Sequence, residues 1–184
     1  VDRLDRREQC VSRGALLVLA ESAARLPVPN QPVGREAHLH ARKWFREHIQ
    51  QSGLEFRTDG AGNHSAVLPC DDPTAPTLIL GSHLDSVPKG GRFDGALGVM
   101  AALEVLKTVR ENGIKLKVQL EAMDFTDEEG THLSLFGSSA ISGHLSREAL
   151  KNPYSGHENF TAGLARAGLT EESLLTAKRP KESL

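Results

Sequence analysis

The chain has 184 residues, enough for one domain with a hydrophobic core. Hydrophobic residues make up 39% and charged residues 25%, a balance typical of a globular protein rather than a disordered or fibrous one. The formal net charge is −2, from 22 Lys and Arg against 24 Asp and Glu. This near balance argues against a dedicated nucleic-acid-binding protein or a protein that binds anionic membranes, because both need an excess or a stripe of basic residues.

The two cysteines, Cys10 and Cys70, are far apart and form no CxxC pair. A disulfide framework or a thiolate zinc site is therefore not expected, and a reducing compartment fits. The sequence has no apolar run long enough to span a bilayer and no pattern typical of a signal peptide. We therefore expect a cytoplasmic protein that does not enter the membrane.

Apolar residues at helical spacing predict two helices before the first strand. The first covers residues 11–26 and ends before Pro27, and the second covers residues 34–52. We expect the inner face of the second helix to consist of Leu39, Trp44, Phe45 and Ile49. Residues 54–69 then alternate around the glycine-rich turn 59–63, which predicts a β-hairpin.

A strand, a helix and a second strand are expected next. The continuous apolar run 77–80 is typical of a strand buried on both faces, residues 95–112 predict a helix, and residues 115–125 predict the next strand. This order predicts a parallel pair of strands within an α/β sheet. Short helices are expected at residues 137–145, 146–151 and 158–167.

Polar residues follow both strands of this βαβ unit. The first strand runs into His83 and Asp85, and the second runs into the acidic residues 127–129. Because the carboxyl ends of parallel strands line one edge of an open α/β sheet, we expect these side chains to converge. Asp94 precedes the connecting helix, whose amino end lies at the same edge and stabilises a carboxylate.

One imidazole beside several carboxylates indicates a bound cation, because adjacent acids repel one another unless a metal or an arginine compensates. Nitrogen together with carboxylate oxygen suits zinc, manganese or cobalt. Asp85, two residues from His83, is expected to hold the imidazole in position. Each feature alone has an ordinary structural explanation: a helix cap for Asp94, a solvated turn for the acidic run and simple packing for His83. Their joint occurrence favours a metal site.

The other reactive side chains support no second site. We expect the surface-type helix and the hairpin to leave four histidines in solvent: His38, His40, His48 and His64. His132 is expected to cap a helix or to face solvent. Neither cysteine lies in an acid–base arrangement that would activate a nucleophile, so a cysteine nucleophile is not expected. The glycine-rich stretch 90–98 lacks G-x-G-x-x-G spacing, and nucleotide binding is therefore weakly supported.

These motifs resemble a known family. GSHLDSVPKGGRFDGALGVMAALEVL, followed by DFTDEEG, resembles the dinuclear-metal amidohydrolases of the aminoacylase and carboxypeptidase superfamily. The most similar branch holds N-carbamoyl-L-amino-acid hydrolases, β-ureidopropionases and allantoate amidohydrolases, and REAHLHARKWFREHIQQSGLEFRTDGAGN also resembles it. The resemblance implies a three-layer α/β/α domain of the zinc-exopeptidase type with a mostly parallel central sheet, of which residues 1–184 are the N-terminal portion.

The resemblance also implies roles for individual residues. His83 corresponds to a ligand of one metal, Asp94 to the carboxylate that bridges two metals, and Glu129 to a ligand of the second. Asp85 corresponds to the residue that orients His83, and Glu128 to the base that takes a proton from water. The implied cofactors are two divalent ions, with zinc first and manganese, cobalt or nickel as alternatives. The implied substrate is a small amide or carbamoyl compound, and the implied assembly is a homodimer.

The chain also departs from the family. A further histidine ligand and the inserted lid and dimerisation domain are not found within residues 1–184, and His132 stands where an arginine is expected. We therefore expect an incomplete sheet on the C-terminal side and no turnover by this chain alone. The family also predicts a cis peptide bond after Asp94. A metallo-exopeptidase, an N-acyl amino-acid deacylase and a catalytically silent α/β module remain alternatives.

Overall fold

The computed structural model describes residues 36–87, 90–91 and 93–180. The helix expected at residues 11–26 lies outside these residues. Within these ranges, four strands form one sheet in the order β1-β2-β4-β3, with bounds Glu55–Thr58 (β1), His64–Leu68 (β2), Thr77–His83 (β3) and Gln119–Phe125 (β4). The described part of the chain also contains six helices, with bounds Glu36–Gln51 (α2), Ala96–Glu111 (α3), Phe136–Ser142 (α4), Arg147–Lys151 (α5), His157–Ala167 (α6) and Glu171–Thr176 (α7).

The expected βαβ unit is present as β3, α3 and β4. β3 and β4 are parallel, with a register that runs from Thr77 opposite Gln119 to His83 opposite Phe125. β4 also pairs antiparallel with β2, and β2 pairs antiparallel with β1 through the expected hairpin. The α/β class is confirmed. Within the described residues, however, the sheet is mixed rather than mostly parallel, because the hairpin contributes two antiparallel pairs.

β3 is an edge strand in this part of the chain, not a strand buried on both faces. It pairs only with β4 among the described strands, and Leu78 is 45% exposed. β4 lies inside the sheet, and its residues 120–124 are all buried. The apolar run 77–80 therefore predicts a strand correctly. The burial of that strand depends on which strands and helices lie next to it, and the local sequence does not show this.

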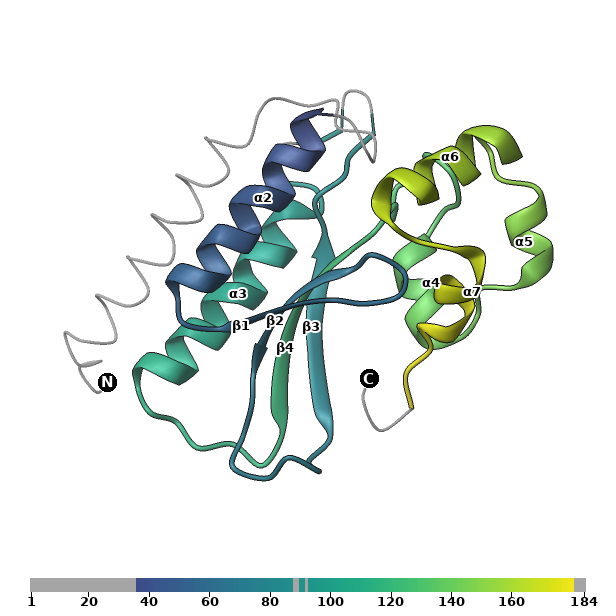
Figure 1. Ribbon diagram of the computed structural model, residues 1–184. Coiled ribbons are helices and arrows are strands. Elements are labelled where there is room, and N and C mark those ends of the chain that lie inside the picture. The colour runs from purple at the N-terminus through teal and green to yellow at the C-terminus, as the bar shows by residue number, and fades with distance from the viewer. Residues whose placement is uncertain (1–35, 88–89, 92, 181–184) are drawn as a thin grey trace.

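Helices α2 and α3 cover one face of the sheet, and α4 to α7 form a separate group on its other side (Figure 1). The first core contains Phe45 and Ile49 of α2, both fully buried, packed with α3 and with alternate residues of β4. Leu39 was expected on this inner face and is instead 55% exposed. The buried face of α2 also contains His38 and Arg42. A pattern of apolar residues cannot predict that polar residues are buried at these positions.

The second core joins α4 to α7 with the turn of the β1–β2 hairpin. Asn63, 1% exposed, links this turn to the end of β4: its side-chain oxygen accepts the N–H of Thr126 at 2.8 Å, and its amide donates to Gly137 O at 3.2 Å. Helix α7 was not expected; its capping box uses Thr170 and Ser173, without the usual Glu or Gln.

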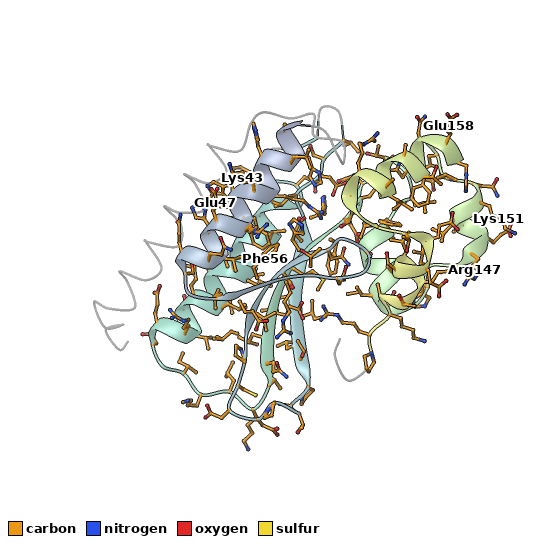
Figure 2. The ribbon with its side chains drawn as sticks, viewed as in Figure 1. Lys43, Glu47, Phe56, Arg147, Lys151 and Glu158 are labelled. Atoms are coloured by element: carbon orange, nitrogen blue, oxygen red, sulfur yellow. The ribbon has the colours of Figure 1, made fainter. Side chains whose placement is uncertain are left out.

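Charged side chains lie on the outer sides of both helical layers. Figure 2 shows Lys43 and Glu47 on α2, and Arg147, Lys151 and Glu158 on the other group. On the second face of the sheet, Arg179 pairs with the buried Glu121 of β4. Of the helices that the structure describes, none is both long enough and apolar enough to cross a membrane.

Candidate metal centre

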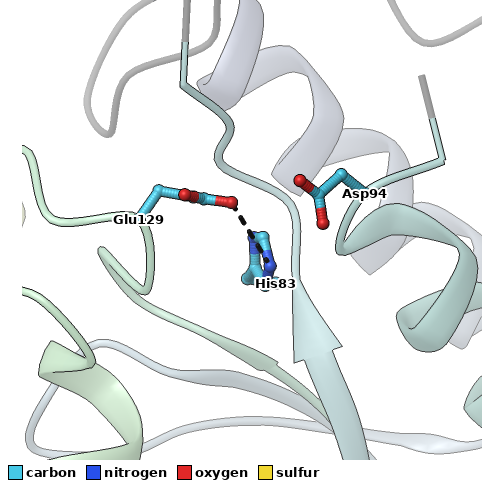
Figure 3. A group of neighbouring side chains, drawn as sticks. All are labelled: His83, Asp94 and Glu129. Carbon is cyan, nitrogen blue, oxygen red and sulfur yellow. Dashed lines mark ion pairs between the residues drawn. The ribbon is translucent and has the colours of Figure 1, made fainter. Parts of the chain in front are cut away.

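Three side chains from separate segments meet at the carboxyl edge of β3 and β4. His83 is the last residue of β3, Glu129 lies in the turn after β4, and Asp94 lies just before α3. One ligand atom from each lies within 4.8 Å of the other two. His83 Nε2 is 3.8 Å from Glu129 Oε1, and the Asp94 carboxylate faces the same space (Figure 3). The structure thus brings together the residues that strand order places at one edge.

The imidazole of His83 is held through its other nitrogen. Nδ1 lies 2.9 Å from the backbone carbonyl oxygen of Asp85. A carbonyl oxygen only accepts, so this contact favours the tautomer in which Nδ1 carries the proton. Nε2 then presents its lone pair toward Glu129 and Asp94, as a metal ligand must.

The carboxylate of Asp85 accepts two backbone N–H groups of the acidic turn. Asp85 is 1% exposed; its Oδ2 accepts the N–H of Glu129 at 3.1 Å, and its Oδ1 accepts that of Glu128 at 3.4 Å. Oδ1 is 3.7 Å from His83 Nδ1, beyond hydrogen-bonding distance. The backbone carbonyl of Asp85 makes the hydrogen bond to the imidazole, and its carboxylate lies beside the ring and accepts from the acidic turn. The role of Asp85 in orienting His83 stays a prediction.

Glu128 lies on the same turn as Glu129 and contacts the start of α4. Its Oε2 accepts the N–H of Ser138 at 3.4 Å. Partial burial raises the pKa of Glu128 above its usual range, while hydrogen bonds from Ser138 oppose the rise. A carboxylate with a raised pKa is better matched to accepting and returning a proton near neutral pH. Two adjacent glutamates thus occupy different environments.

Asp127 builds the turn that carries both glutamates. It adopts a positive φ of 52°, and its carboxylate accepts three N–H groups: Thr131 at 2.6 Å, His132 at 2.7 Å and Leu133 at 2.9 Å. Burial raises the pKa of Asp127 to about 6, although these hydrogen bonds favour its charged form. In the sequence, Asp127 looks like one more acid of the run 127–129. Only its place directly before the two candidate site glutamates could have indicated that it builds their turn.

The chain turns sharply between Asp94 and α3. Gly95 has φ 69° and ψ −58°, and Ala96 N donates to Asp94 O at 2.7 Å, which together define a γ-turn. No cis peptide bond occurs among the described residues, so the expectation of one after Asp94 is wrong. The γ-turn at a glycine provides the reversal. A Cβ at Gly95 would lie 2.4 Å from His83 O and 2.5 Å from the imidazole, so this backbone touches the candidate ligand.

Of the histidines expected in solvent, His38 is buried and His64 is half-buried. His38 is 1% exposed, and burial lowers its pKa to about 2; burial also lowers the pKa of His64 to about 3. His40 is exposed, as expected. His132 neither caps a helix nor projects freely into solvent: its Nδ1 lies 2.6 Å from Ser155 Oγ, and its ring packs against Phe160.

The donor set fits a divalent metal ion. Two ligand atoms that each lie about 2 Å from one ion are at most about 4 Å apart, and the His83–Glu129 pair at 3.8 Å meets this condition. One imidazole with two carboxylates is a known zinc ligand combination and also suits manganese or cobalt. His83 Nδ1 is already hydrogen-bonded, which leaves Nε2 for the ion.

Comparison with known proteins agrees with this geometry. Residues 63–155, which contain the hairpin end, the βαβ unit and all five candidate site residues, match the profile of peptidase family M28. The chain belongs to this family. M28 is a metallopeptidase family, and membership supports the use of a metal by the His83, Asp94 and Glu129 cluster.

Relatives of this M28 chain include several amidohydrolases. It is 36% identical over 161 residues to an N-carbamoyl-L-amino acid amidohydrolase of Geobacillus stearothermophilus, covering 83% of this chain and 39% of the relative. It is 32% identical over 123 residues to an allantoate amidohydrolase of Bacillus subtilis, covering 62% and 30%. A hydantoinase/carbamoylase family amidase from Burkholderia ambifaria matches with a TM-score of 0.74 at 30% identity, over 86% of this chain and 40% of that one.

The resemblance noted from the motifs is therefore confirmed. The M28 chain spans less than half the length of the curated relatives it matches. Their activities belong to longer proteins, and for this chain they enter as proposals.

Proposed function

We propose that this protein is a metal-dependent hydrolase of linear amide C–N bonds, acting on N-carbamoyl amino acids or related ureido compounds. The observation that carries the proposal is the meeting of His83, Asp94 and Glu129 within 4.8 Å, with Glu128 beside them on the same turn. The substrate class comes from relatives named as N-carbamoyl-L-amino acid and allantoate amidohydrolases.

His83, Asp94 and Glu129 would hold the metal, with zinc as the first candidate. A bound divalent ion polarises a carbonyl oxygen and lowers the pKa of water toward neutrality. Glu128 accepts the proton of the attacking water and returns it to the departing nitrogen. Asp85 fixes the turn that carries Glu128 and Glu129 by accepting both backbone N–H groups.

Metal content and turnover test the proposal together. The 184-residue chain and a chain extended to the length of the relatives are purified, their zinc, manganese, cobalt and nickel are measured, and ammonia release from N-carbamoyl amino acids and allantoate is followed. We expect the extended chain to bind metal and to turn over a ureido substrate, and the 184-residue chain to bind metal weakly with no turnover. Robust turnover by the 184-residue chain contradicts the expectation that the site needs ligands from outside residues 1–184.

A metallo-exopeptidase is the second candidate, because the profile match is to a peptidase family. Dipeptides and N-acetyl amino acids in the same assay separate the candidates. Turnover of dipeptides without turnover of carbamoyl substrates replaces the first proposal with the second. An extended chain that folds, binds no metal and hydrolyses neither class points to a silent α/β module.

A further inference from the structure

A buried ion pair lies directly behind the two loops of the metal centre. Asp124 of β4 is fully buried, and its Oδ2 is 2.8 Å from Nε of Arg42 in α2. We propose that Arg42 and Asp124 are a positioning pair that sets the placement of the His83–Asp85 loop relative to the turn that carries Glu128 and Glu129. The importance of the two loops for metal binding rests on the proposed function. The placement of the loops by Arg42 and Asp124 does not depend on that function.

Asp124 acts on the first loop. Its Oδ1 accepts the N–H of Leu84 at 2.8 Å. Leu84 lies between His83 and Asp85, one residue beyond the last register pair of β3 and β4. Its N–H therefore has a side-chain acceptor where the backbone ladder stops. This hydrogen bond ends β3 at His83 and turns the chain so that His83 Nδ1 reaches the carbonyl of Asp85.

Arg42 connects the same carboxylate to the second loop. One terminal nitrogen donates to Thr126 Oγ1 at 3.0 Å, and the other donates to Gly62 O at 2.9 Å. Thr126 directly precedes the acidic turn, and Gly62 lies in the hairpin turn that Asn63 ties to Thr126. A planar guanidinium with several fixed donors can meet these acceptors together, which an ammonium group cannot.

A role limited to packing α2 accounts less well for this pattern. An ion pair that only held α2 to the sheet would not need the Leu84 contact or the Thr126 contact. Buried ion pairs are also weak contributors to stability, and their replacement by apolar residues is often neutral or stabilising. Arg42 is 9% exposed and Asp124 is 0% exposed, so the pair occupies volume that two apolar side chains can fill. Stability and loop placement can therefore be separated by mutation.

The main variant is the double substitution Arg42→Met/Asp124→Leu, which removes both charges and leaves neither one unpaired. Amide hydrogen exchange is measured without metal in the protein and in this variant. We expect the N–H groups of Leu84, Glu128 and Glu129 to exchange about tenfold faster, because each loses a hydrogen bond or the loop that supports it. We expect amides in the middle of the β3–β4 ladder to keep their protection.

Phe45→Leu is the matched control, since Phe45 is fully buried on the same helix. It lowers the stability of the α2 packing but keeps every hydrogen bond that Arg42 and Asp124 make to the two loops, so it should leave the three loop amides protected. Lys43→Met, on the outer side of α2, controls for loss of a helix charge (Figure 2). Unchanged protection at the three amides in a folded double variant overturns the inference, as does an equal loss of protection in Phe45→Leu.

Metal affinity gives a second readout. Binding of Co²⁺, followed by its absorption spectrum, should weaken about 10- to 100-fold in the double variant, as for other residues that orient ligands. Arg42→Lys keeps the positive charge, and its Co²⁺ affinity should lie between that of the unmodified protein and that of the double variant. Equal Co²⁺ affinity in the protein and the double variant overturns the inference. A wild-type protein that binds no metal overturns the proposed function, and the amide exchange still decides the positioning role.

Discussion

The carboxylate of Asp85 accepts the backbone N–H of Glu129 at 3.1 Å, across 44 positions of the chain. It accepts the neighbouring N–H of Glu128 with its other oxygen. One buried side chain at the end of β3 thereby fixes the turn at the end of β4, while its own backbone carbonyl holds the imidazole of His83. Asp85 therefore links three groups of the site, and this makes it the first residue to test.

Asp85→Asn keeps the size of the side chain but replaces one acceptor with an N–H donor that faces a backbone N–H. We expect the protein to fold and its metal affinity to fall by about 10- to 100-fold, because Glu129 loses its fixed position. Titration with Zn²⁺ or Co²⁺ measures the change. Asp71→Asn, at an exposed aspartate paired with Lys115, is the control and should bind metal as the parent does. Parental affinity in Asp85→Asn would show that the turn holds its place without this carboxylate.

Substitution of each glutamate by glutamine distinguishes the roles of Glu128 and Glu129. Glu128→Gln removes basicity while keeping size, so kcat of the extended chain should fall by about 10²- to 10⁴-fold with metal content near that of the parent. Glu129→Gln should lose metal and recover part of its activity at high metal concentration, because a neutral amide is a poorer ligand. Bound metal and kcat are measured for both variants. The reverse pattern exchanges the two roles, and two unaffected variants remove both residues from the site.

Gly95→Ala should disturb His83 as well as the local backbone. The new Cβ would lie 2.4 Å from His83 O and 2.5 Å from its ring, and the residue has a positive φ of 69°. We expect a loss of about 1–3 kcal/mol in the free energy of unfolding, together with weaker metal binding. Gly113→Ala is a close control, because Gly113 has φ +62° and a Cβ there meets no atom within 4 Å.

Chemical denaturation and metal titration separate the two effects. Gly113→Ala should show a loss of stability without a change in metal affinity. A Gly95→Ala variant that binds metal as tightly as Gly113→Ala does would mean that the contact with His83 does not position the ligand.

His64→Phe should change how stability depends on pH. Burial first, and then Arg42 and Arg46, lower the pKa of His64 from 6.5 to about 3, so the folded protein holds this group neutral. The unfolded chain takes up a proton below about pH 6.5 that the folded chain does not, and stability is lost as the pH falls from 7 toward 3. Nδ1 of His64 is buried with no hydrogen-bond partner among the described residues, so the phenyl ring loses no bond there.

Relative to the parent, the His64→Phe variant should gain up to about 2 kcal/mol in the free energy of unfolding when the pH falls from 7.5 to 5. Urea denaturation at both pH values measures the gain. The same substitution at the exposed His40 is the control. A difference between variant and parent that is constant over this range would show that the imidazole of His64 takes up its proton in the folded state too.

Sequence pattern was sufficient for the order and type of most described elements. Apolar periodicity and glycine positions predicted α2, the β1–β2 hairpin, the βαβ unit and three of the later helices, because these signals act within a few residues. The same signals misjudged Leu39 and the burial of β3. Local periodicity predicts which residues share a face of a helix or strand. It does not predict whether that face packs against other elements or is exposed to solvent.

The chain order of strand, helix and strand, with polar residues after each strand, was enough to bring His83, Asp94 and Glu129 to one edge of the sheet, since parallel strands end on the same side. Only the tertiary structure decided the partners of buried polar groups. It brought the Asp85 carboxylate to the backbone N–H groups of the acidic turn, and it placed Arg42 beside Asp124. A hydrogen bond depends on distances of a few tenths of an ångström between segments far apart in the chain, and no pattern of residue types carries that information.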